Sequence, residues 1–416
     1  MRIAIIGSGV SGLVCAHLLQ PRHDVVLYEA DDRPGGHSHT HRVEMADATV
    51  DVDTGFLVYN ERTYPLFCRL LERLGVATQP SDMSFGVADS LTGLEWRGTS
   101  PTTVFAQRRN IARPEFLRML ADVVRFNRLA RGLLENPPPD EVTLEEVLSF
   151  QRWSQGFRDW YLVPLGSSIW SAGPRTFTRI PAATFARFFE RHGLLSLHDQ
   201  PRWRTITGGS RSYVQAILRP LRQEGRLRLG TPVDKIRRGP DGVELVGPAG
   251  LELFDHVVVA THSNQALALL SDPHPSERRI LGAIGYQANS ATLHTDVRLL
   301  PRSRRAWASW NYHRLDTETD HATLTYNLSQ LQAIPSQTPL LVTLNRDDAI
   351  DPALVLARMD YAHPVLDPAA IAAQKRHAEI NGVRRTWFCG AYWGYGFHED
   401  GVASAVKTCR ALGATL

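Results

Sequence analysis

The feature that most constrains the fold is a glycine-rich turn near the N-terminus, between a short apolar strand and a helix. Residues 3–6 are apolar, residues 7–12 read Gly-Ser-Gly-Val-Ser-Gly, and residues 13–19 continue as an apolar helical stretch. A second apolar strand covers residues 25–28 and ends in Glu29. This order predicts a βαβ unit whose helix N-terminus binds the diphosphate of a dinucleotide.

Each glycine of this turn has a predicted role. Gly7 permits the tight turn, Gly9 lets the backbone approach the diphosphate, and Gly12 lets the helix pack closely on the strand. The first helical residues, Val10 and Ser11, belong to a turn whose N–H groups are unpaired and favour an anion. The same stretch also has the look of a signal peptide, but the glycine spacing gives the better account.

The acid at the end of the second strand indicates which nucleotide is bound. The carboxylate of Glu29 can accept hydrogen bonds from both ribose hydroxyls of an adenosine. It would also repel a 2′-phosphate, which disfavours NADP at this site.

A pair of glycines after Glu29 and Ala30 favours FAD over NAD. Gly35 and Gly36 resemble the second phosphate-and-ribityl loop of FAD enzymes of the amine oxidase class, in which paired glycines let the chain pass close to an extended ligand. The next residue is His37, where that class usually has arginine, so its contact is open.

The histidines that follow permit a second interpretation. His37, His39 and His41 alternate, and on a strand they would place three imidazoles on one face, as in a metal site. We favour a strand that leaves the cofactor loop, and we expect no metal.

Two distant segments support the FAD interpretation. Residues 254–261 resemble a late strand of the same sheet, with Ala260 in the turn beneath the adenine. Residues 387–391 predict a final strand that ends at Gly390, and a helix is expected from about residue 402 to residue 412. In the amine oxidase class, a helix N-terminus here points at the ribityl chain and the flavin and stabilises the reduced flavin. The resemblance implies that the backbone of Asp400, Gly401 and Val402, with His398 beside them, contacts the cofactor.

Further stretches along nearly the whole chain resemble one group more closely. They include residues 53–60 (DTGFLVYN), 208–214 (GGSRSYV), 309–312 (SWNY) and 396–401 (GFHEDG). They are similar to the flavoprotein half of plant cyclopropane fatty acid synthases, and to free-standing bacterial flavoproteins encoded beside such synthases. The resemblance implies that Thr54, Gly55, Phe56 and Val233 also line the FAD site, and that lipid acyl chains are the substrate.

These segments predict an α/β protein of two interleaved domains. A Rossmann-like, glutathione reductase-type FAD-binding domain is expected from residues 1–80, 204–285 and 375–416. A substrate domain of mixed sheet and helices is expected from residues 81–203 and 286–374, because residues 81–200 are rich in aromatic side chains and helical in pattern.

Composition excludes several other classes of protein. The net charge is only +3, which argues against a dedicated nucleic-acid binder. The 4 cysteines form no C-x-x-C pair, so neither a zinc ribbon nor a disulfide framework is indicated, and a reducing, cytoplasmic compartment is expected. No apolar run approaches the ~20 residues of a membrane span.

One helix leaves a membrane contact open. Residues 114–134 predict a basic amphipathic helix that interleaves arginines with leucines. Such a helix can rest on an anionic membrane at its inner face and admit a lipid, or it can simply face the core, which is the more common case.

Few polar residues are candidates for catalysis. Tyr59, His398 and Glu399 are the predicted catalytic groups, with His398 and Glu399 expected just before the C-terminal helix as acid–base partners. The alternatives are a hydrogen-bonded structural histidine and an acid that only offsets the helix dipole.

A missing lysine bears on the reaction. Amine oxidases of the resembled class carry a lysine on a substrate-domain strand, where it holds a water at the flavin and aids the reaction with oxygen. Residues 236–374 contain no lysine, and His294 is the only base in residues 286–295, where that lysine is expected. We therefore predict that the protein is not an efficient amine oxidase.

Three hypotheses of function follow. The first is an FAD-dependent oxidoreductase that dehydrogenates or isomerises a fatty acyl chain or a phospholipid acyl group. The second is an oxidase of small amines or amino acids. The third is a non-catalytic flavoprotein partner of a lipid methyltransferase.

Overall fold

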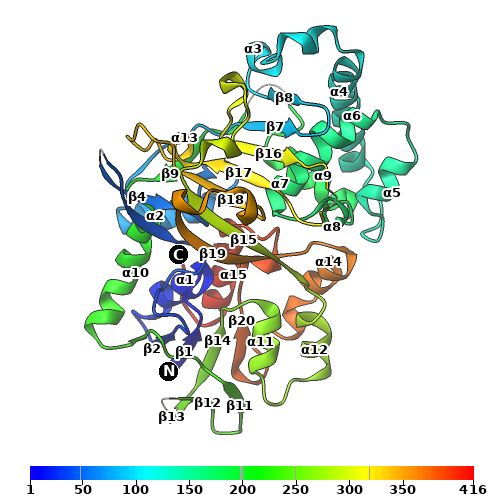
Figure 1. Cartoon of the computed structure of the whole chain (residues 1–416). Coiled ribbons are helices and arrows are strands. Elements are labelled where there is room, and N and C mark those ends of the chain that lie inside the picture. The colour runs from blue at the N-terminus through cyan, green and yellow to red at the C-terminus, as the bar shows by residue number, and fades with distance from the viewer. Residues whose placement is uncertain (47, 197–199, 249, 318) are drawn as a thin grey trace.

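Two sheets organise the chain. The computed structural model describes residues 1–46, 48–196, 200–248, 250–317 and 319–416. The lower part of Figure 1 contains a parallel sheet of order β10-β2-β1-β14-β20. Its strands are β1 (Arg2–Ile6), β2 (Asp24–Tyr28), β10 (Leu227–Arg228), β14 (His256–Val259) and β20 (Thr386–Phe388). The predicted first, middle and last segments therefore pair in one sheet, which confirms the predicted fold class.

Both faces of this sheet are buried because successive apolar side chains point to opposite cores. Ile3 and Ile5 pack with α1 (Val10–Leu19), α10 (Arg211–Gln223) and α15 (His398–Ala411). Ala4 and Ile6 face the opposite core, which is formed with α11 (Ser263–Leu269), α12 (Pro275–Leu281) and the antiparallel strands β11 (Lys235–Arg238), β12 (Val243–Gly247) and β13 (Gly250–Phe254). The continuous apolar runs of the sequence are typical of such a strand.

The upper part of Figure 1 contains a seven-stranded mixed sheet of order β19-β15-β18-β17-β16-β7-β8. Its strands are β7 (Phe85–Asp89), β8 (Leu94–Arg97), β15 (Tyr286–His294), β16 (Trp310–Arg314), β17 (Leu324–Asn327), β18 (Leu341–Leu344) and β19 (Val355–Pro364). Residues 81–200 are thus not wholly helical, because β7 pairs with β16 and brings β8 into the sheet.

Helices and aromatic side chains cover this second sheet. Its core includes Phe116, Phe126, Phe157, Phe185 and Phe189. They come from α4 (Pro114–Glu135), α6 (Gln155–Phe157) and α9 (Ala182–Arg191), with α7 (Val163–Trp170) packed near β16. The predicted amphipathic helix is therefore present. In the part of the chain that the structure describes, no helix is long and apolar enough to cross a membrane.

Short strands connect the two regions where the chain passes between them. Strand β9 (Trp203–Ile206) pairs with β5 (Tyr59–Asn60) and β6 (Thr78–Pro80), and β3 (Thr40–Glu44) forms a hairpin with β4 (Thr49–Asp53). Helix α14 (Pro368–Lys375) bridges the cores, because Ala370 and Ala373 pack under the parallel sheet while Ile371 joins the other core. The predicted boundary at residue 375 falls at the end of this bridge.

The remaining helices are short. They are α2 (Pro65–Leu74), α3 (Pro101–Val104), α5 (Leu144–Ser149), α8 (Pro174–Phe177) and α13 (Leu328–Leu331), together with η1 (Arg108–Ala112), η2 (Arg158–Leu162), η3 (Val297–Leu299), η4 (Arg304–Ala306), η5 (Asp347–Ala349), η6 (Pro352–Leu354), η7 (His377–Glu379), η8 (Val383–Arg385) and η9 (Ala391–Trp393).

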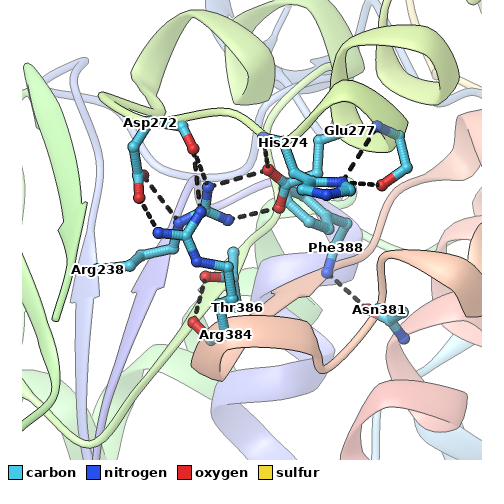
Figure 2. A network of polar contacts seen from close by, with 9 residues as sticks. Arg238, Asp272, His274, Glu277, Asn381, Arg384, Thr386 and Phe388 are labelled. Atoms are coloured by element: carbon cyan, nitrogen blue, oxygen red, sulfur yellow. Dashed lines mark hydrogen bonds and ion pairs between the residues drawn. The ribbon is translucent and has the colours of Figure 1, made fainter. Parts of the chain in front are cut away.

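A buried ion pair fixes the outer layer of the parallel sheet (Figure 2). The guanidinium of Arg238 donates to the Glu277 carboxylate at 2.9 Å and to the Asp272 carboxylate at 3.0 Å. The side chains of Arg238 and Glu277 are each only 2% exposed. Arg384 donates to the Asp272 carbonyl at 3.1 Å, so β11, α12 and η8 are tied together on the side of the sheet that faces away from α1. Removing one partner of such a buried pair lowers the free energy of unfolding by several kcal/mol, so the pair has a structural role here.

Candidate active site

The glycine turn after β1 forms an open cradle. Gly7 has φ +96, and a Cβ on Gly12 would lie 1.9 Å from the Gly7 carbonyl oxygen, so both positions require glycine. Gly9 has φ −62 and caps α1 without a side-chain hydrogen bond. A Cβ on Gly9 would meet no heavy atom within 4 Å. Open space before an uncapped helix N-terminus that includes Val10 and Ser11 fits a diphosphate.

Glu29 lies at the carboxyl end of β2, beside this cradle. Its carboxylate accepts N–H groups from Ser8 at 2.8 Å and Asp31 at 3.1 Å, which leaves further lone pairs for ribose hydroxyls. The N–H of Thr231 donates to the Glu29 carbonyl at 2.9 Å. Val233 follows two residues later, and Ala30 is exposed beside Glu29. The residues predicted for the adenosine end are therefore brought together.

The second glycine pair faces the first loop. Gly35 has φ +116 and Gly36 has φ +57, and a Cβ on Gly36 would lie 3.2 Å from the Gly9 Cα. The Ser8 hydroxyl accepts the Gly35 N–H at 3.0 Å and so joins the two loops. These loops bring together positions far apart in sequence, as a stretched dinucleotide requires.

Residues 54–56 run beside the second glycine loop. A Cβ on Gly55 would lie 2.2 Å from the His37 carbonyl oxygen, and the Phe56 N–H donates to the same oxygen at 2.7 Å. The Thr54 hydroxyl lies 3.3 Å from the His39 carbonyl oxygen. These close backbone approaches explain the small residue at position 55.

The late turn and the final strand also reach the cradle. A Cβ on Gly7 would lie 3.0 Å from the Ala260 carbonyl oxygen, so the turn after β14 lies directly under the first glycine. Gly390 follows β20, and its N–H donates to the Ser404 hydroxyl of α15 at 2.9 Å. The Ser11 hydroxyl donates to the Gly401 carbonyl at 3.0 Å, which places the start of α15 against the start of α1.

The C-terminal helix begins earlier than the sequence predicted, at His398 rather than near residue 402. The Gly401 N–H donates to the Phe397 carbonyl at 3.1 Å, and the Val402 side chain is fully buried. The helix N–H groups without a helical partner therefore belong to His398, Glu399 and Asp400. The predicted backbone donors at Gly401 and Val402 lie too far along the chain, because the Asp400 carboxylate accepts the Phe397 N–H at 3.0 Å and starts the helix there.

The three residues predicted to be catalytic each make structural contacts. The His398 ring stacks on Phe56 at 3.5 Å between centroids, and its Nε2 lies 3.1 Å from the Ser38 hydroxyl. Burial lowers the pKa of His398 to about 3. The geometry favours the structural alternative for His398, and a catalytic role stays a prediction.

Glu399 and Tyr59 have comparable surroundings. The two carboxylate oxygens of Glu399 accept the N–H groups of Leu66 and Phe67, each at 2.9 Å. They thus satisfy the N-terminus of α2 from a different helix. Tyr59 is 2% exposed and packs edge-on against Phe67 at 5.4 Å. Catalytic roles for both also stay predictions.

A cluster of rings that sequence analysis did not identify lies between the two regions. We call it the seam; its members are His37, His262, Tyr286, Tyr361 and His363. His37 lies 4.9 Å from Tyr361 and 5.3 Å from His363 between ring centroids, and His262 stacks on Tyr286 at 4.5 Å. The seam joins the Gly35–Gly36 loop, the turn after β14 and the paired ends of β15 and β19. It lies at the carboxyl ends of the parallel strands, where ligands of such sheets bind.

The imidazoles of the seam are neutral near pH 7. Burial, and then His262, lowers the pKa of His363 to about 4. Burial is also the main cause that holds the pKa of His37 well below its usual range, and His363 adds to it. Neutral imidazoles can donate at one ring nitrogen and accept at the other.

The alternative of a histidine metal site is not supported. His37 turns toward His363, whereas His39 stacks on His41 at 4.0 Å, so the three alternating rings do not share one face. Only His41 lies in a strand, because β3 begins at Thr40. Across the described ranges, no group of three or more His, Cys, Asp or Glu side chains is arranged to hold a metal ion.

The strand expected to supply a lysine presents an asparagine to the seam. Asn289 on β15 is 1% exposed, and its amide nitrogen lies 3.2 Å from His363 Nδ1. His294, the only base that the sequence offered on this strand, lies 2.7 Å from the Thr343 hydroxyl on the opposite face. Asn289 thus shares one face of the sheet with Tyr361 and His363 of the paired strand β19, whereas His294 shares the opposite face with Thr343.

Comparisons with known proteins agree with this geometry. Residues 10–362 match the family of flavin containing amine oxidoreductases. The chain is 26% identical over 287 residues to AofH of Mycobacterium tuberculosis, which is named as a flavin-containing monoamine oxidase. That match covers 65% of this chain and 59% of the relative, so the chain spans about three fifths of the length of this relative.

Solved structures share the fold. Cyclohexylamine oxidase from Brevibacterium oxydans superimposes with a TM-score of 0.71 at 18% identity, covering 99% of this chain and 98% of that one. A fatty acid isomerase from P. acnes superimposes with a TM-score of 0.66 at 15% identity, covering 98% of each chain. The family match extends over most of the sequence, from the first turn of α1 through the second glycine loop, and the cradle fits the FAD predicted from the sequence. The chain therefore belongs to the flavin containing amine oxidoreductase family.

Proposed function

We propose that the protein is an FAD-dependent oxidoreductase that dehydrogenates or isomerises a fatty acyl chain or a phospholipid acyl group. The observation that carries this proposal is the uncharged character of the seam. Its own polar groups are neutral imidazoles, phenols and the amide of Asn289, and no lysine occurs in the strand that faces it. The guanidinium of Arg33 at its border donates to the Gly36 carbonyl at 3.0 Å. An uncharged acyl chain suits such surroundings better than an ammonium group does.

The residues of this chain would bind and orient rather than react. The first glycine loop and Glu29 hold the dinucleotide end, and the seam meets it from the other sheet. Bound FAD would supply the hydride acceptor that such a reaction needs. The aromatic core over the second sheet provides apolar surroundings and excludes water.

The names of the similar proteins do not identify the substrate of this one. Their names include amine oxidases and a fatty acid isomerase on the same fold, and one fold serves many reactions. The closer sequence resemblance to flavoproteins fused to, or encoded beside, cyclopropane fatty acid synthases supports the lipid side of the proposal. A partnership with a lipid methyltransferase belongs to the same proposal, and co-purification with such an enzyme would test it.

The substrate is tested with the purified, FAD-loaded protein under anaerobic conditions. We expect unsaturated or methyl-branched acyl lipids to bleach the flavin, or to be recovered with a shifted double bond, and we expect cyclohexylamine and tryptophan to do neither. Product analysis is needed because an isomerisation leaves the flavin oxidised at the end. Bleaching by amines alone, with rapid reoxidation by oxygen, would select the amine oxidase function instead.

The outer face of α4 supports a contact with an anionic lipid surface. Leu117 and Val124 are 43% and 44% exposed and lie two turns apart on one face. Arg118 and Arg128 flank them, and no acidic partner of either is found in the described part of the chain. Exposed apolar side chains rimmed by unpaired arginines complement a bilayer of anionic headgroups.

Flotation with vesicles tests this surface. We expect the protein to float with vesicles that contain phosphatidylglycerol and not with neutral ones, and we expect a Leu117→Ser, Val124→Ser variant to lose most of the binding. The matched control is a Leu251→Ser, Leu253→Ser variant of β13. These two leucines are 54% and 47% exposed on a different part of the molecule. Equal flotation of both variants would exclude α4 as the docking face.

A further inference from the structure

A chain of three side chains on the second sheet ends at the seam. Asn345 follows β18 with φ +56, and its amide oxygen accepts the Ser290 N–H at 3.1 Å. Its amide nitrogen donates to the Ala322 carbonyl at 2.8 Å. A backbone donor on one side and a backbone acceptor on the other leave only one orientation for this amide.

The fixed orientation of the Asn345 amide also fixes the orientation of the Asn289 amide. The Asn345 amide nitrogen also donates to the Asn289 amide oxygen at 2.8 Å. The Asn289 amide nitrogen is therefore the group that faces the Gln287 carbonyl at 3.3 Å and His363 Nδ1 at 3.2 Å. Because an amide nitrogen can only donate, Nδ1 of His363 is an acceptor and carries no proton.

The tautomer of His363 follows from this series of hydrogen bonds. Burial lowers the pKa of His363 to about 4, so the ring is neutral near pH 7 and holds a single proton. With Nδ1 accepting, that proton is on Nε2. No hydrogen-bond partner for Nε2 is found among the described residues, and the ring lies 5.3 Å from His37, next to the Gly35–Gly36 loop.

We propose that Asn345 and Asn289 hold His363 as a fixed Nε2–H donor toward the ribityl–flavin end of bound FAD. The inference rests on the FAD site and not on the lipid substrate. A donor that faces the flavin favours the reduced form, because reduction places more negative charge on the ring. His363 is thus the contact of the second domain with the cofactor, and Asn289 and Asn345 are positioning residues.

The reduction potential of the bound flavin tests the proposal without any substrate. We expect His363→Ala to weaken the binding of reduced FAD relative to oxidised FAD by about tenfold, which is about 30 mV lower in potential for a two-electron couple. His274→Asn is the control, because His274 is an exposed histidine at the start of α12 (Figure 2) and its replacement keeps a capping side chain. We expect that variant to keep the potential of the unaltered protein.

A second variant reverses the hydrogen bond without removing the ring. In Asn289→Asp, the carboxylate can only accept, so Nδ1 of His363 must carry a proton and the pKa of the imidazole rises. We expect the flavin potential and spectrum of this variant to change with pH near the raised pKa, with the more positive potential on the acid side.

Three outcomes decide the proposal. A folded His363→Ala protein with a lowered potential, or one that no longer retains FAD, supports the contact. A folded, FAD-loaded His363→Ala protein with unchanged potential and spectrum overturns it. If that variant does not fold, Asn289→Asp decides, and a flavin with the same pH dependence as the unaltered protein overturns the proposal.

Discussion

The two sides of the cofactor site differ in how their histidines are held. On the side of the parallel sheet, His398 is 9% exposed, stacked on Phe56 and hydrogen-bonded to Ser38. On the side of the seven-stranded sheet, His363 is half-buried, and its one hydrogen bond to the described residues joins Nδ1 to the Asn289 amide. The His398 ring is therefore held by stacking and by two hydroxyl groups, whereas Nε2 of His363 has no hydrogen-bond partner in the part of the chain that the structure describes.

This difference shows that a histidine next to a cofactor motif is not by itself a catalytic group. The motif residues 396–401 build the start of α15, where the Asp400 carboxylate caps this helix, the Glu399 carboxylate caps α2 and the His398 ring stacks on Phe56. The polar side chains Asn289 and His363 come instead from strands β15 and β19, and the His363 ring meets the cradle at His37. Substitutions on both sides of the site test this difference, and they are ordered here by decreasing effect on the cofactor.

The largest effect is expected at Gly9. In Gly9→Asp, the backbone at φ −62 accepts a side chain and no heavy atom lies within 4 Å of the new Cβ, so the apo-protein should fold. The added carboxylate would occupy the space of the diphosphate and repel it, so we expect complete loss of FAD. The absorbance spectrum of the purified protein measures this loss. Gly132→Asp, at an equally open position on α4, should retain the yellow colour.

Glu29→Ala should weaken FAD binding without unfolding the protein. The loss of hydrogen bonds to a charged group corresponds to about 1–3 kcal/mol, a factor of roughly 5 to 150 in the dissociation constant. Isothermal titration of the apo-protein with FAD measures the change. An unchanged affinity would mean that Glu29 serves only the N–H groups of Ser8 and Asp31.

Glu399→Ala should lower stability rather than chemistry. Removing the carboxylate leaves the N–H groups of Leu66 and Phe67 unpaired at the start of α2, at a cost of about 1–2 kcal/mol. We expect a lower thermal midpoint and a normal flavin spectrum. If the variant keeps its midpoint but changes the pH dependence of flavin reduction, Glu399 is an acid–base group and the contrast drawn here is wrong.

The smallest effect on the cofactor is expected from Asp400, which bears on the pH dependence of stability. Burial raises the pKa of Asp400 to about 7. Because the folded-state pKa lies above the unfolded value of about 4, the folded protein binds the extra proton, and stability falls as pH rises from about 4 to 7. We expect Asp400→Asn, which keeps an acceptor for the Phe397 N–H, to flatten this fall in chemical denaturation of the apo-protein. If stability falls equally with pH in both proteins, Asp400 is not the cause of the fall.

Much of the cradle could be predicted because its signals are local. The strand–turn–helix pattern of residues 3–19 and the glycine pair at 35–36 depend on neighbours in sequence, and the structure has them as expected. The start of α15 was missed because Asp400 reaches back to the Phe397 N–H, a contact that competes with the glycine-rich run before it. Strand β7 was missed because its partner β16 lies more than two hundred residues away, and β8 joins the sheet only through its hairpin with β7.

Local sequence patterns predict the nucleotide-binding unit and the family, because strand–turn–helix periodicity and glycine spacing involve neighbouring residues, and the sequence shows directly that the strand at the seam has no lysine. Which polar side chains meet in the seam depends on the tertiary fold. Asn289 and His294 lie five residues apart on one strand and point to opposite faces, and His363 reaches His37 only because β19 pairs with β15. Side-chain direction and long-range strand pairing, not composition, therefore distinguish the structural histidines His294 and His398 from His363.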